Sequence, residues 1–479
     1  MKLRTWQSAC VVSALDTYHW KRHFLCLATP GAGKTTMAAE LAAQLLEIGE
    51  IDFVLCFAPS VAVTSGLKNT FQRRLQKRFD GRIGAVGGAY TYQGMRTLGE
   101  EFWSLFDSHR VLVVFDEIHH CAGNDQGGLN AWGLEILARI QHKAAFTLAL
   151  TGTPWRSDKR PIALSEYTDP GGEIQCDYVY GLREAVRDGV CRKPSIVLID
   201  NDRVSLKQAE EQSLYSGLHE LFANSDVRYQ QLLHNPEALR FCLSLACQQL
   251  DRLRSTNPYA GGLVVASSIA HAEEIAGVLR SDFDKSACVV TYKHKNAGKI
   301  IDEYRHSSQE WIVSVGMISE GTDIPRLQVC CHLSRITTEL YFRQVLGRIL
   351  RITERCGANA WLYTFAEPQL VEFANRVTEE LPNIGLLRLE ALPESAGQHT
   401  EHRANPSSQT LDLAWENPAD AGEFLGNAHF LNDGASQLSD SYCLLDCIGE
   451  FREKLIDLFE KDINANSGAG MPSECSVLG

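Results

Sequence analysis

A glycine-rich turn carrying a lysine lies near the start of the chain, between a strand-like run and a helix-like segment. Phe24–Ala28 is apolar and strand-sized, whereas Lys34–Leu46 is rich in Ala, Leu and Glu at helical spacing. The turn reads Ala28-Thr29-Pro30-Gly31-Ala32-Gly33-Lys34-Thr35-Thr36. Glycines in this context let backbone N–H groups wrap around phosphate oxygens at a helix N-terminus. This feature restricts the chain to an α/β fold that contains a phosphate-binding loop.

The side chains of this loop predict a site for a nucleoside triphosphate with a magnesium ion. Lys34 would supply charge to the β- and γ-phosphates, and the Thr35 hydroxyl can bind Mg²⁺. The strict pattern has glycine where Ala28 stands, and another small residue should preserve the turn. An ordinary glycine-rich turn with a solvated lysine is the alternative. The nucleotide-binding positions expected here are Thr29, Gly31, Ala32, Gly33, Lys34, Thr35 and Thr36.

Two acidic residues end another buried strand. Val111–Phe115 is uniformly apolar and is followed by Asp116-Glu117-Ile118-His119. Carboxylates at the end of a strand with both faces buried are costly unless a cation balances them. We therefore expect Asp116 to hold Mg²⁺ and Glu117 to polarise the attacking water. Acids that cap the strand in solvent are the alternative.

Strand-like and helix-like segments alternate along most of the chain, which indicates parallel sheets with helices on both faces. One series fills residues 1–155 and another begins at Gly261, after polar helical sequence in Leu206–Leu233 and Pro236–Leu253. Four regions are expected: a first lobe over residues 1–160, a helical connection over 161–257, a second lobe over 258–390, and an acidic extension over 391–479 with a disordered end.

The phosphate loop and Asp116-Glu117-Ile118-His119 resemble motifs I and II of superfamily 2 helicases, in the DExH form. Further segments are similar to that family's motifs in the same order: Leu3-Arg4-Thr5-Trp6-Gln7, Phe57-Ala58-Pro59-Ser60, Thr91-Tyr92-Gln93, Thr151-Gly152-Thr153-Pro154, Val313–Pro325 and Gln344–Arg351. The resemblance covers roughly residues 1–366, and order and spacing across both lobes make it specific. It implies two tandem RecA-like domains with ATP and Mg²⁺ between them.

The resemblance implies roles for single residues at the nucleotide. Gln7 would pair with adenine, because an amide offers both a donor and an acceptor. Asp323 would lie near the ribose or the cleft between the lobes. Arg348 and Arg351 are three residues apart on one helical face, so both could reach the transferring γ-phosphoryl group. Gln344 belongs to the same motif.

Other matching positions would contact a nucleic-acid backbone. Loop hydroxyls and helix N-termini suit phosphate contacts, which position a strand without reading its sequence. The Thr-Gly-Thr-Pro and Glu-Gly-Thr-Asp-Ile-Pro segments look more like those of type III restriction motor subunits and DNA-repair translocases than of RNA helicases. DNA is therefore favoured over RNA. The expected contact residues are Pro59, Ser60, Thr91, Tyr92, Gln93 and Thr322.

Charge and composition are compatible with this interpretation. The 479 residues carry a net charge of −13, but 16 acidic and 4 basic residues lie from Glu390 onward, so the preceding part is close to neutral. A near-neutral body can carry a locally basic groove.

The 15 cysteines form no C-x-x-C pair, which favours reduced core thiols over a zinc or iron–sulfur site. The apolar stretches are too short to span a membrane and Met1–Gln7 lacks a signal-peptide core, which predicts a cytoplasmic protein.

We expect a nucleic-acid-stimulated ATP hydrolase that acts as a helicase or translocase on DNA. One alternative is a nucleotide-gated motor subunit of a restriction, defence or repair complex that translocates without unwinding, and another is an RNA helicase. The acidic extension would either dock a nuclease or other partner protein or be a simple soluble tail. A small-molecule phosphotransferase would leave Gln344–Arg351 without a role.

Overall fold

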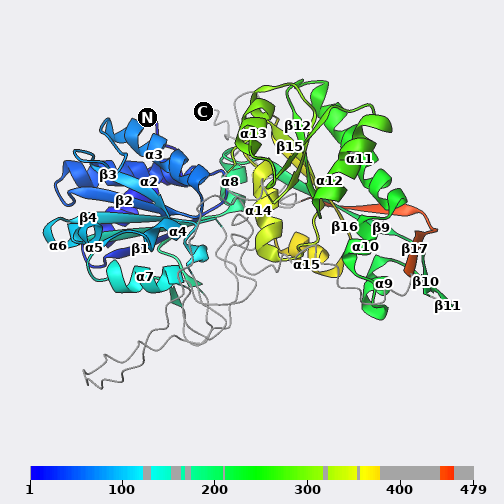
Figure 1. Ribbon diagram of the computed structural model, residues 1–479, viewed down its shortest axis with the longest axis horizontal. Helices are drawn as coiled ribbons and strands as arrows, with labels where there is room; N and C mark the ends of the chain where they lie inside the picture. The colour runs from blue at the N-terminus through cyan, green and yellow to red at the C-terminus, as the bar shows by residue number, and fades with distance from the viewer. Residues whose placement is uncertain are drawn as a thin grey trace, which may run out of the picture.

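The computed structural model has two α/β lobes that lie side by side, with α8 (Leu182–Arg187) between them (Figure 1). It describes residues 2–121, 131–152, 163–167, 174–208, 211–316, 322–352, 357–377 and 443–457. Within these ranges, no helix is both long enough and apolar enough to cross a membrane. The predicted fold class, two tandem RecA-like domains, is confirmed.

Lobe 1 is built on a parallel six-stranded sheet in the order β3-β2-β4-β5-β1-β8. Its strands are β1 (His23–Ala28), β2 (Phe53–Ala58), β3 (Gly87–Thr91), β4 (Val111–Asp116), β5 (Phe146–Thr151) and β8 (Tyr178–Tyr180). One face packs against α1 (Thr5–Thr17), α2 (Lys34–Glu47) and α3 (Val61–Leu75). The other face packs against α4 (Tyr92–Met95), α5 (Glu100–Trp103), α6 (Leu105–Ser108) and α7 (Ala131–Arg139). A separate two-stranded sheet consists of β6 (Glu166–Tyr167) and β7 (Ile174–Gln175).

Strand β4 explains why lobe 1 needs apolar strands throughout. Leu112 and Val114 pack into the core beneath α1, α2 and α3, whereas Val113 and Phe115 pack into the core on the opposite face. Successive side chains of a strand point to opposite faces, so a strand covered on both faces cannot alternate with polar residues. Because the strands are parallel, the phosphate loop after β1 and the acidic residue Asp116 at the end of β4 lie at one edge of the sheet.

Lobe 2 is built on a seven-stranded sheet in the order β13-β14-β12-β15-β16-β9-β18, parallel except for β18. Its strands are β9 (Lys193–Asn201), β12 (Gly261–Ala266), β13 (Ala287–Thr291), β14 (Trp311–Val315), β15 (Leu327–Leu333), β16 (Asn359–Phe365) and β18 (Phe451–Asp457). One face packs against α11 (Pro236–Arg254) and α12 (Ile269–Ser281). The other packs against α13 (Ala297–His306), α14 (Glu339–Ile349) and α15 (Pro368–Arg376).

The region between the lobes differs from the predicted helical connection. It contains β9, β10 (Val204–Gln208) and β11 (Glu211–Tyr215) before α9 (Leu218–Asn224), α10 (Tyr229–Leu233) and α11. Helices α9, α10 and α11 lie in the sequence that was predicted to be helical, whereas the prediction is wrong for β10 and β11. Strand β9 pairs in parallel with β16, so the chain becomes part of the lobe 2 sheet directly after α8. Its partner is distant in sequence, and the local pattern did not reveal the pairing.

Two strands from the predicted acidic extension belong to lobe 2. Strand β18 pairs antiparallel with β9 over seven residues, and β17 (Cys443–Cys447) pairs antiparallel with β10. Leu445 and Cys447 of β17 are buried in the lobe 2 core. The predicted disordered end of the extension lies outside the described residues. Residues 443–457 are therefore structural parts of lobe 2.

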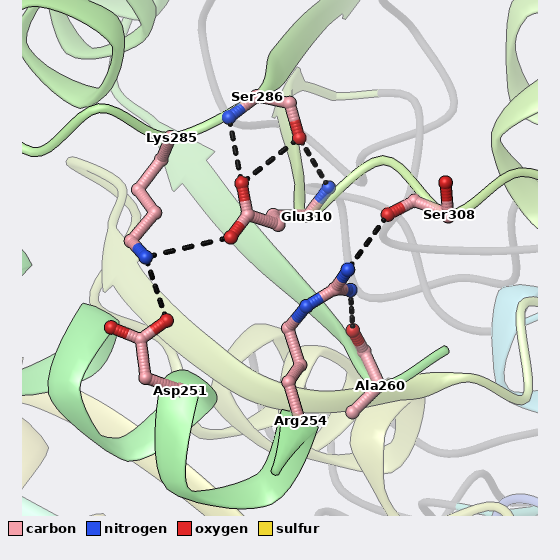
Figure 2. Close-up of polar contacts among 7 residues, drawn as sticks. All are labelled: Asp251, Arg254, Ala260, Lys285, Ser286, Ser308 and Glu310. Atoms are coloured by element: carbon pink, nitrogen blue, oxygen red, sulfur yellow. Dashed lines mark hydrogen bonds and ion pairs between the residues drawn. The ribbon is translucent and has the colours of Figure 1, made fainter. Parts of the chain in front are cut away.

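Polar contacts fasten the end of α11 to the edge of lobe 2 where β12, β13 and β14 begin (Figure 2). The Lys285 ammonium lies 2.6 Å from Asp251 Oδ1 and 3.5 Å from Glu310 Oε1. Arg254 Nη1 donates to the Ala260 carbonyl at 2.7 Å. These contacts hold a helix from the interlobe region against strands that follow it.

A chain that ends at Leu392 should be destabilised, because it lacks β17 and β18. The loss would expose the β9 edge and the core surface that Leu445 and Cys447 cover. We expect the melting temperature of lobe 2 to fall by several degrees, measured by circular dichroism. The control chain ends at Asp457 and keeps both strands, so it should melt like the full chain. Equal melting of all three chains would contradict this structural role.

Candidate nucleotide site between the lobes

Two glycines shape the phosphate loop between β1 and α2. Gly31 and Gly33 have φ values of 84° and 94°, in the left-handed region that favours glycine. A β-carbon on Gly33 would lie 2.8 Å from Gln7 Nε2. The loop therefore has the backbone freedom that the sequence predicted, and a side chain at Gly33 would disturb a neighbouring contact as well as strain the backbone.

The Lys34 ammonium is buried at the start of α2 and has partners within lobe 1. Its Nζ donates to the Ala28 carbonyl at 3.1 Å and lies 3.5 Å from Glu117 Oε1. Glu117 Oε2 accepts a hydrogen bond from the Gly152 N–H at 3.1 Å. Glu117 itself has φ 52°, a strained value for a side-chain-bearing residue. The predicted phosphate-binding lysine and the predicted base thus lie side by side.

Asp116, the last residue of β4, is buried with one oxygen unsatisfied. Its Oδ1 has no hydrogen-bond partner among the described residues. Burial, followed by the nearby charge of Glu117, raises the pKa of Asp116 to about 7, although Lys34 acts in the opposite direction. Tyr92 Oη donates to the Asp116 carbonyl at 2.8 Å and fixes the strand end. A buried, unpartnered carboxylate oxygen is a chemically suitable ligand for Mg²⁺.

His119 connects the acidic segment to the end of β5. Its ring lies in η1 (Ile118–His120) and is fully enclosed. Nδ1 lies 3.1 Å from Thr151 Oγ1 and 3.5 Å from Glu117 Oε2. The sequence identified His119 only as part of a motif and did not assign this contact. Thr153 and Pro154, the rest of the predicted third motif, lie outside the described residues.

The end of α14 in lobe 2 packs directly on the phosphate loop of lobe 1. A β-carbon on Gly347 would lie 2.7 Å from Pro30 Cβ, so glycine permits the approach. A β-carbon on Gly31 would lie 3.0 Å from Arg351 Cγ. Figure 1 shows α14 on the side of lobe 2 that faces lobe 1. The structure thus brings the predicted lobe 2 motif to the predicted phosphate loop.

Both predicted arginines of lobe 2 are held by the segment before β15. Arg348 Nη1 donates to the Thr322 carbonyl at 2.7 Å, and Arg351 Nη1 donates to the same carbonyl at 3.1 Å. Arg351 also forms an ion pair with Asp323. Gln344 is buried one turn earlier in α14. Residues 317–321 of the predicted fifth motif lie outside the described residues.

Gln7 contacts the phosphate loop through its amide. Nε2 donates to the Gly33 carbonyl at 2.9 Å, and Oε1 accepts from the Arg4 N–H at 2.8 Å. Arg4 Nη1 donates to the Ala32 carbonyl at 2.7 Å. The sequence predicted a contact with adenine, and the structure adds a contact with the loop itself. The sequence analysis did not identify Arg4 as a site residue. Its position within the Leu3–Gln7 motif was the one sequence feature that could have indicated this role.

The predicted nucleic-acid residues of lobe 1 differ in their accessibility. Ser60 and Thr91 are half-buried N-caps, whose hydroxyls accept from Val63 and Gly94 respectively. Gln93 is exposed, and Pro59 is buried. All of them follow the carboxyl ends of β2 and β3, on the sheet edge that carries the phosphate loop.

Tyr92 is the exception among these residues. Its side chain is 0% exposed and stacks on Trp132, with ring centroids 5.9 Å apart. The Tyr92 side chain is therefore enclosed and its hydroxyl donates to the Asp116 carbonyl, while its predicted contact with nucleic acid stays a prediction.

A second polar cluster in lobe 2 contains two histidines and a glutamate. His234, His271 and Glu274 place possible ligand atoms within 4.8 Å of one another. However, His271 Nδ1 accepts from the Ser267 N–H, so the neutral ring carries its proton on Nε2. Burial, with a smaller effect of His234, lowers the pKa of His271 to about 4, which keeps the ring neutral. We assign no metal to this cluster.

Comparison with known proteins supports the resemblance seen in the sequence. Residues 1–156 match the family described as "Type III restriction enzyme, res subunit". The archaeal "DNA 3'-5' translocase XPB2" of Sulfurisphaera tokodaii is 24% identical over 382 residues, which cover 73% of this chain and 79% of that protein. Over both lobes, the chain resembles superfamily 2 helicases related to the type III restriction motor. The resemblance predicted from the sequence is thereby confirmed.

The chain is also similar to an uncharacterized protein of Mycobacterium tuberculosis, Rv2917. The two are 31% identical over 393 residues, which cover 78% of this chain and 63% of the mycobacterial protein. The chain thus spans somewhat less than two thirds of the length of this relative.

Two solved restriction enzymes share the fold of this chain. A fragment of a putative HsdR subunit of a type I restriction enzyme from Vibrio vulnificus matches with a TM-score of 0.55 and 18% identity, over 79% of this chain and 67% of the fragment. The type ISP restriction-modification enzyme LlaBIII, bound to DNA, matches with a TM-score of 0.54 and 13% identity, over 79% of this chain and 30% of LlaBIII. At these identities the likeness concerns the fold.

The raised pKa of Asp116 makes stability depend on pH. The folded chain keeps a proton on this carboxyl up to about pH 7, whereas the unfolded chain releases it near pH 4. Stability therefore falls as the pH rises through this window. Asp116→Asn mimics the protonated form, so its melting temperature should exceed that of the wild type by several degrees at pH 8 and by little at pH 4.5, without nucleotide or Mg²⁺.

Asp52→Asn is the matched control in the same lobe. Arg110 hydrogen-bonds to Asp52 and lowers the pKa of that exposed carboxyl, so this substitution should give no gain at pH 8. An Asp116→Asn gain that is constant from pH 4.5 to pH 8 would contradict the buried-carboxyl account.

Proposed function

We propose that the chain is a DNA-stimulated ATPase that translocates along DNA, with ATP and Mg²⁺ bound where the lobes meet. The observation that carries the proposal is the packing of α14 on the phosphate loop, which puts Gly347 against Pro30 and Arg351 against Gly31. Groups from both lobes would then act on one triphosphate. A ligand that bridges two lobes favours their closure, and its hydrolysis removes that preference.

In this proposal the lobe 1 residues bind the triphosphate and Mg²⁺ and activate the attacking water. Lys34 would exchange its contact with Glu117 for the β- and γ-phosphates, which frees the Glu117 carboxylate to accept a proton from the attacking water. Thr35 and Asp116 would hold Mg²⁺, and the unpartnered Asp116 Oδ1 supports that role. The bound ion would neutralise charge on the phosphates. Gln7 would stabilise the phosphate loop through its hydrogen bond to the Gly33 carbonyl and would also contact adenine.

The lobe 2 arginines would stabilise charge that develops on the γ-phosphoryl group. Arg348 and Arg351 share the Thr322 carbonyl, so both side chains are held near the phosphate loop. Asp323 pairs with Arg351 and would set its position relative to the ribose side of the cleft. In general, an arginine that serves this role contributes a factor of about 10³–10⁵ to the rate.

DNA is the proposed polymer. The similarity to a DNA translocase and to a restriction enzyme bound to DNA supports it. The phosphate backbone would be contacted by Ser60, Thr91, Gln93 and Thr322, with Ser60 and Thr91 at helix N-termini.

The second candidate function is translocation along DNA without strand separation. The similarity to restriction-enzyme subunits favours such a motor subunit. A cytoplasmic location is part of the proposal.

Lys34→Ala should reduce ATP turnover at least about 100-fold, because the phosphates lose their principal cation. Glu117→Gln should reduce turnover similarly but retain nucleotide binding. The measurement is phosphate release from purified chain with a DNA cofactor, alongside binding of a fluorescent ATP analogue.

Lys21→Ala is the matched control for the lysine. Lys21 is a partly buried lysine of lobe 1 that pairs with Asp177 at 3.1 Å. It lies before β1, at the other end of the strand from the phosphate loop. This variant should keep turnover within about twofold. Wild-type turnover in Lys34→Ala would refute the site assignment.

DNA should stimulate ATP turnover more than RNA does, with an effect that weakens steeply as salt rises, because phosphate contacts release counterions. The measurement compares no polymer, single-stranded DNA, duplex DNA and RNA across a salt series. Turnover that is indifferent to every polymer would contradict the motor proposal, and stimulation by RNA alone would favour an RNA helicase. Displacement of a triplex strand without unwinding of a fork would identify a pure translocase.

A partner protein at the acidic extension is a further part of the proposal. Its test needs a deletion that spares β17 and β18, such as removal of residues 392–440, because a chain that ends at Leu392 also loses part of lobe 2. A nuclease or repair protein captured by the full chain and released by this deletion would support docking there.

A further inference from the structure

Arg192 lies where the chain crosses from lobe 1 to lobe 2, and its side chain is 0% exposed. It follows α8 and directly precedes β9. Few positions are less favourable for a permanently charged group, because burial of a cation is costly unless polar partners surround it. What surrounds the Arg192 guanidinium therefore indicates why the residue is there.

The guanidinium donates to backbone carbonyls of three separate segments. Nη1 donates to Leu327 at 2.6 Å and to Ile349 at 2.8 Å. Nη2 donates to Pro325 at 2.9 Å, and Nε donates to Gly357 at 3.1 Å. Leu327 and Pro325 lie at the start of β15, Ile349 ends α14, and Gly357 precedes β16. One side chain thus links the start of β15 to the end of α14.

Those two segments carry the proposed γ-phosphate residues. Arg348 lies in the last turn of α14 and Arg351 lies two residues beyond the helix. Both donate to the Thr322 carbonyl, in the segment that runs into β15. Arg192 therefore fixes, from inside the lobe, the separation between the arginines and the backbone that holds them.

The chain at Cys191 and Arg192 contacts both the turn after α14 and the phosphate loop. The Arg192 N–H donates to the Leu350 carbonyl at 2.7 Å, and Cys191 forms an antiparallel bridge with Arg351. Cys191 Sγ donates to the Pro30 carbonyl at 3.6 Å. The crossing segment therefore contacts the loop of lobe 1 and the arginine-bearing turn of lobe 2 together.

We propose that Arg192 is a positioning residue for ATP hydrolysis, which holds the α14 end and the Thr322–Leu327 segment in register so that Arg348 and Arg351 meet the phosphate loop. The inference rests on the proposed ATPase function. Lysine cannot replace it, because an ammonium is a single point, whereas the planar guanidinium reaches carbonyls on several sides. A displacement of about 1 Å in catalytic groups can cost about 10²-fold in rate.

The test is steady-state ATP turnover of Arg192→Lys and Arg192→Gln in the full chain with DNA, below the melting temperature of each variant. We expect kcat to fall about 10-fold or more, while KM for ATP and the affinity for a fluorescent ATP analogue change less than about threefold. A merely structural role would lower the melting temperature and the active fraction without changing kcat per folded molecule.

Arg254 supplies a matched control within lobe 2. Its guanidinium also donates to backbone carbonyls of two segments, Ala260 at 2.7 Å and Ser308 at 3.0 Å (Figure 2). Both of these carbonyls lie outside α14 and outside the Thr322–Leu327 segment. Arg254→Lys should reduce stability but leave kcat within about twofold of the wild type.

A double-mutant cycle with Arg348→Ala distinguishes positioning from an independent effect. Arg348→Ala alone should slow hydrolysis by about 10³-fold and leave ATP binding by lobe 1 intact. If Arg192 acts through the arginines, Arg192→Lys should cost less than about threefold more in that background. A full 10-fold loss on top of Arg348→Ala, or an unchanged kcat in both Arg192 variants, would overturn the inference. A wild-type chain without ATPase activity would instead refute the proposed function.

Discussion

The contact between α14 and the phosphate loop is the constraint on which the candidate site depends. Two glycines make it possible, since a side chain at Gly347 would collide with Pro30 and one at Gly31 would crowd Arg351. Bare backbone on both sides lets the two lobes approach within van der Waals distance. Cationic groups from lobe 2 then reach a loop that lobe 1 has already shaped with Gly33, Gln7 and its own backbone.

Charge in lobe 1 is balanced locally. Lys34 lies between the Ala28 carbonyl and Glu117, and Asp116 is close enough to both charges that they shift its pKa in opposite directions. Asp116, which has an unpartnered oxygen, is also the residue whose neutral form is favoured by burial. A divalent cation would reverse that preference. A bound divalent cation would therefore favour the ionised form of Asp116, and Lys34 would balance negative charge on a triphosphate.

The sequence predicted the two-lobe architecture and which motifs lie close together at the candidate site, because strand–loop–helix order and motif spacing are local properties. It failed where partners are remote. Strand β9 looked like part of a helical connection because its partner β16 is far along the chain, and β18 looked like part of a tail for the same reason. Tyr92 matched a nucleic-acid motif, and only packing reveals that it is enclosed beneath Asp116.

The pairing of β18 with β9 joins residues about 250 positions apart, as the Arg452–Asp202 contact beside it does. On a ribosome, the lobe 1 sheet is complete after Tyr180, whereas the lobe 2 sheet lacks its last strand until Asp457 has emerged. Long-range pairings of this kind form slowly, and an unpaired edge invites association with other chains. Translation therefore leaves the β9 edge unpaired for the time needed to make the intervening residues, and during that time the growing chain is most prone to associate with other chains.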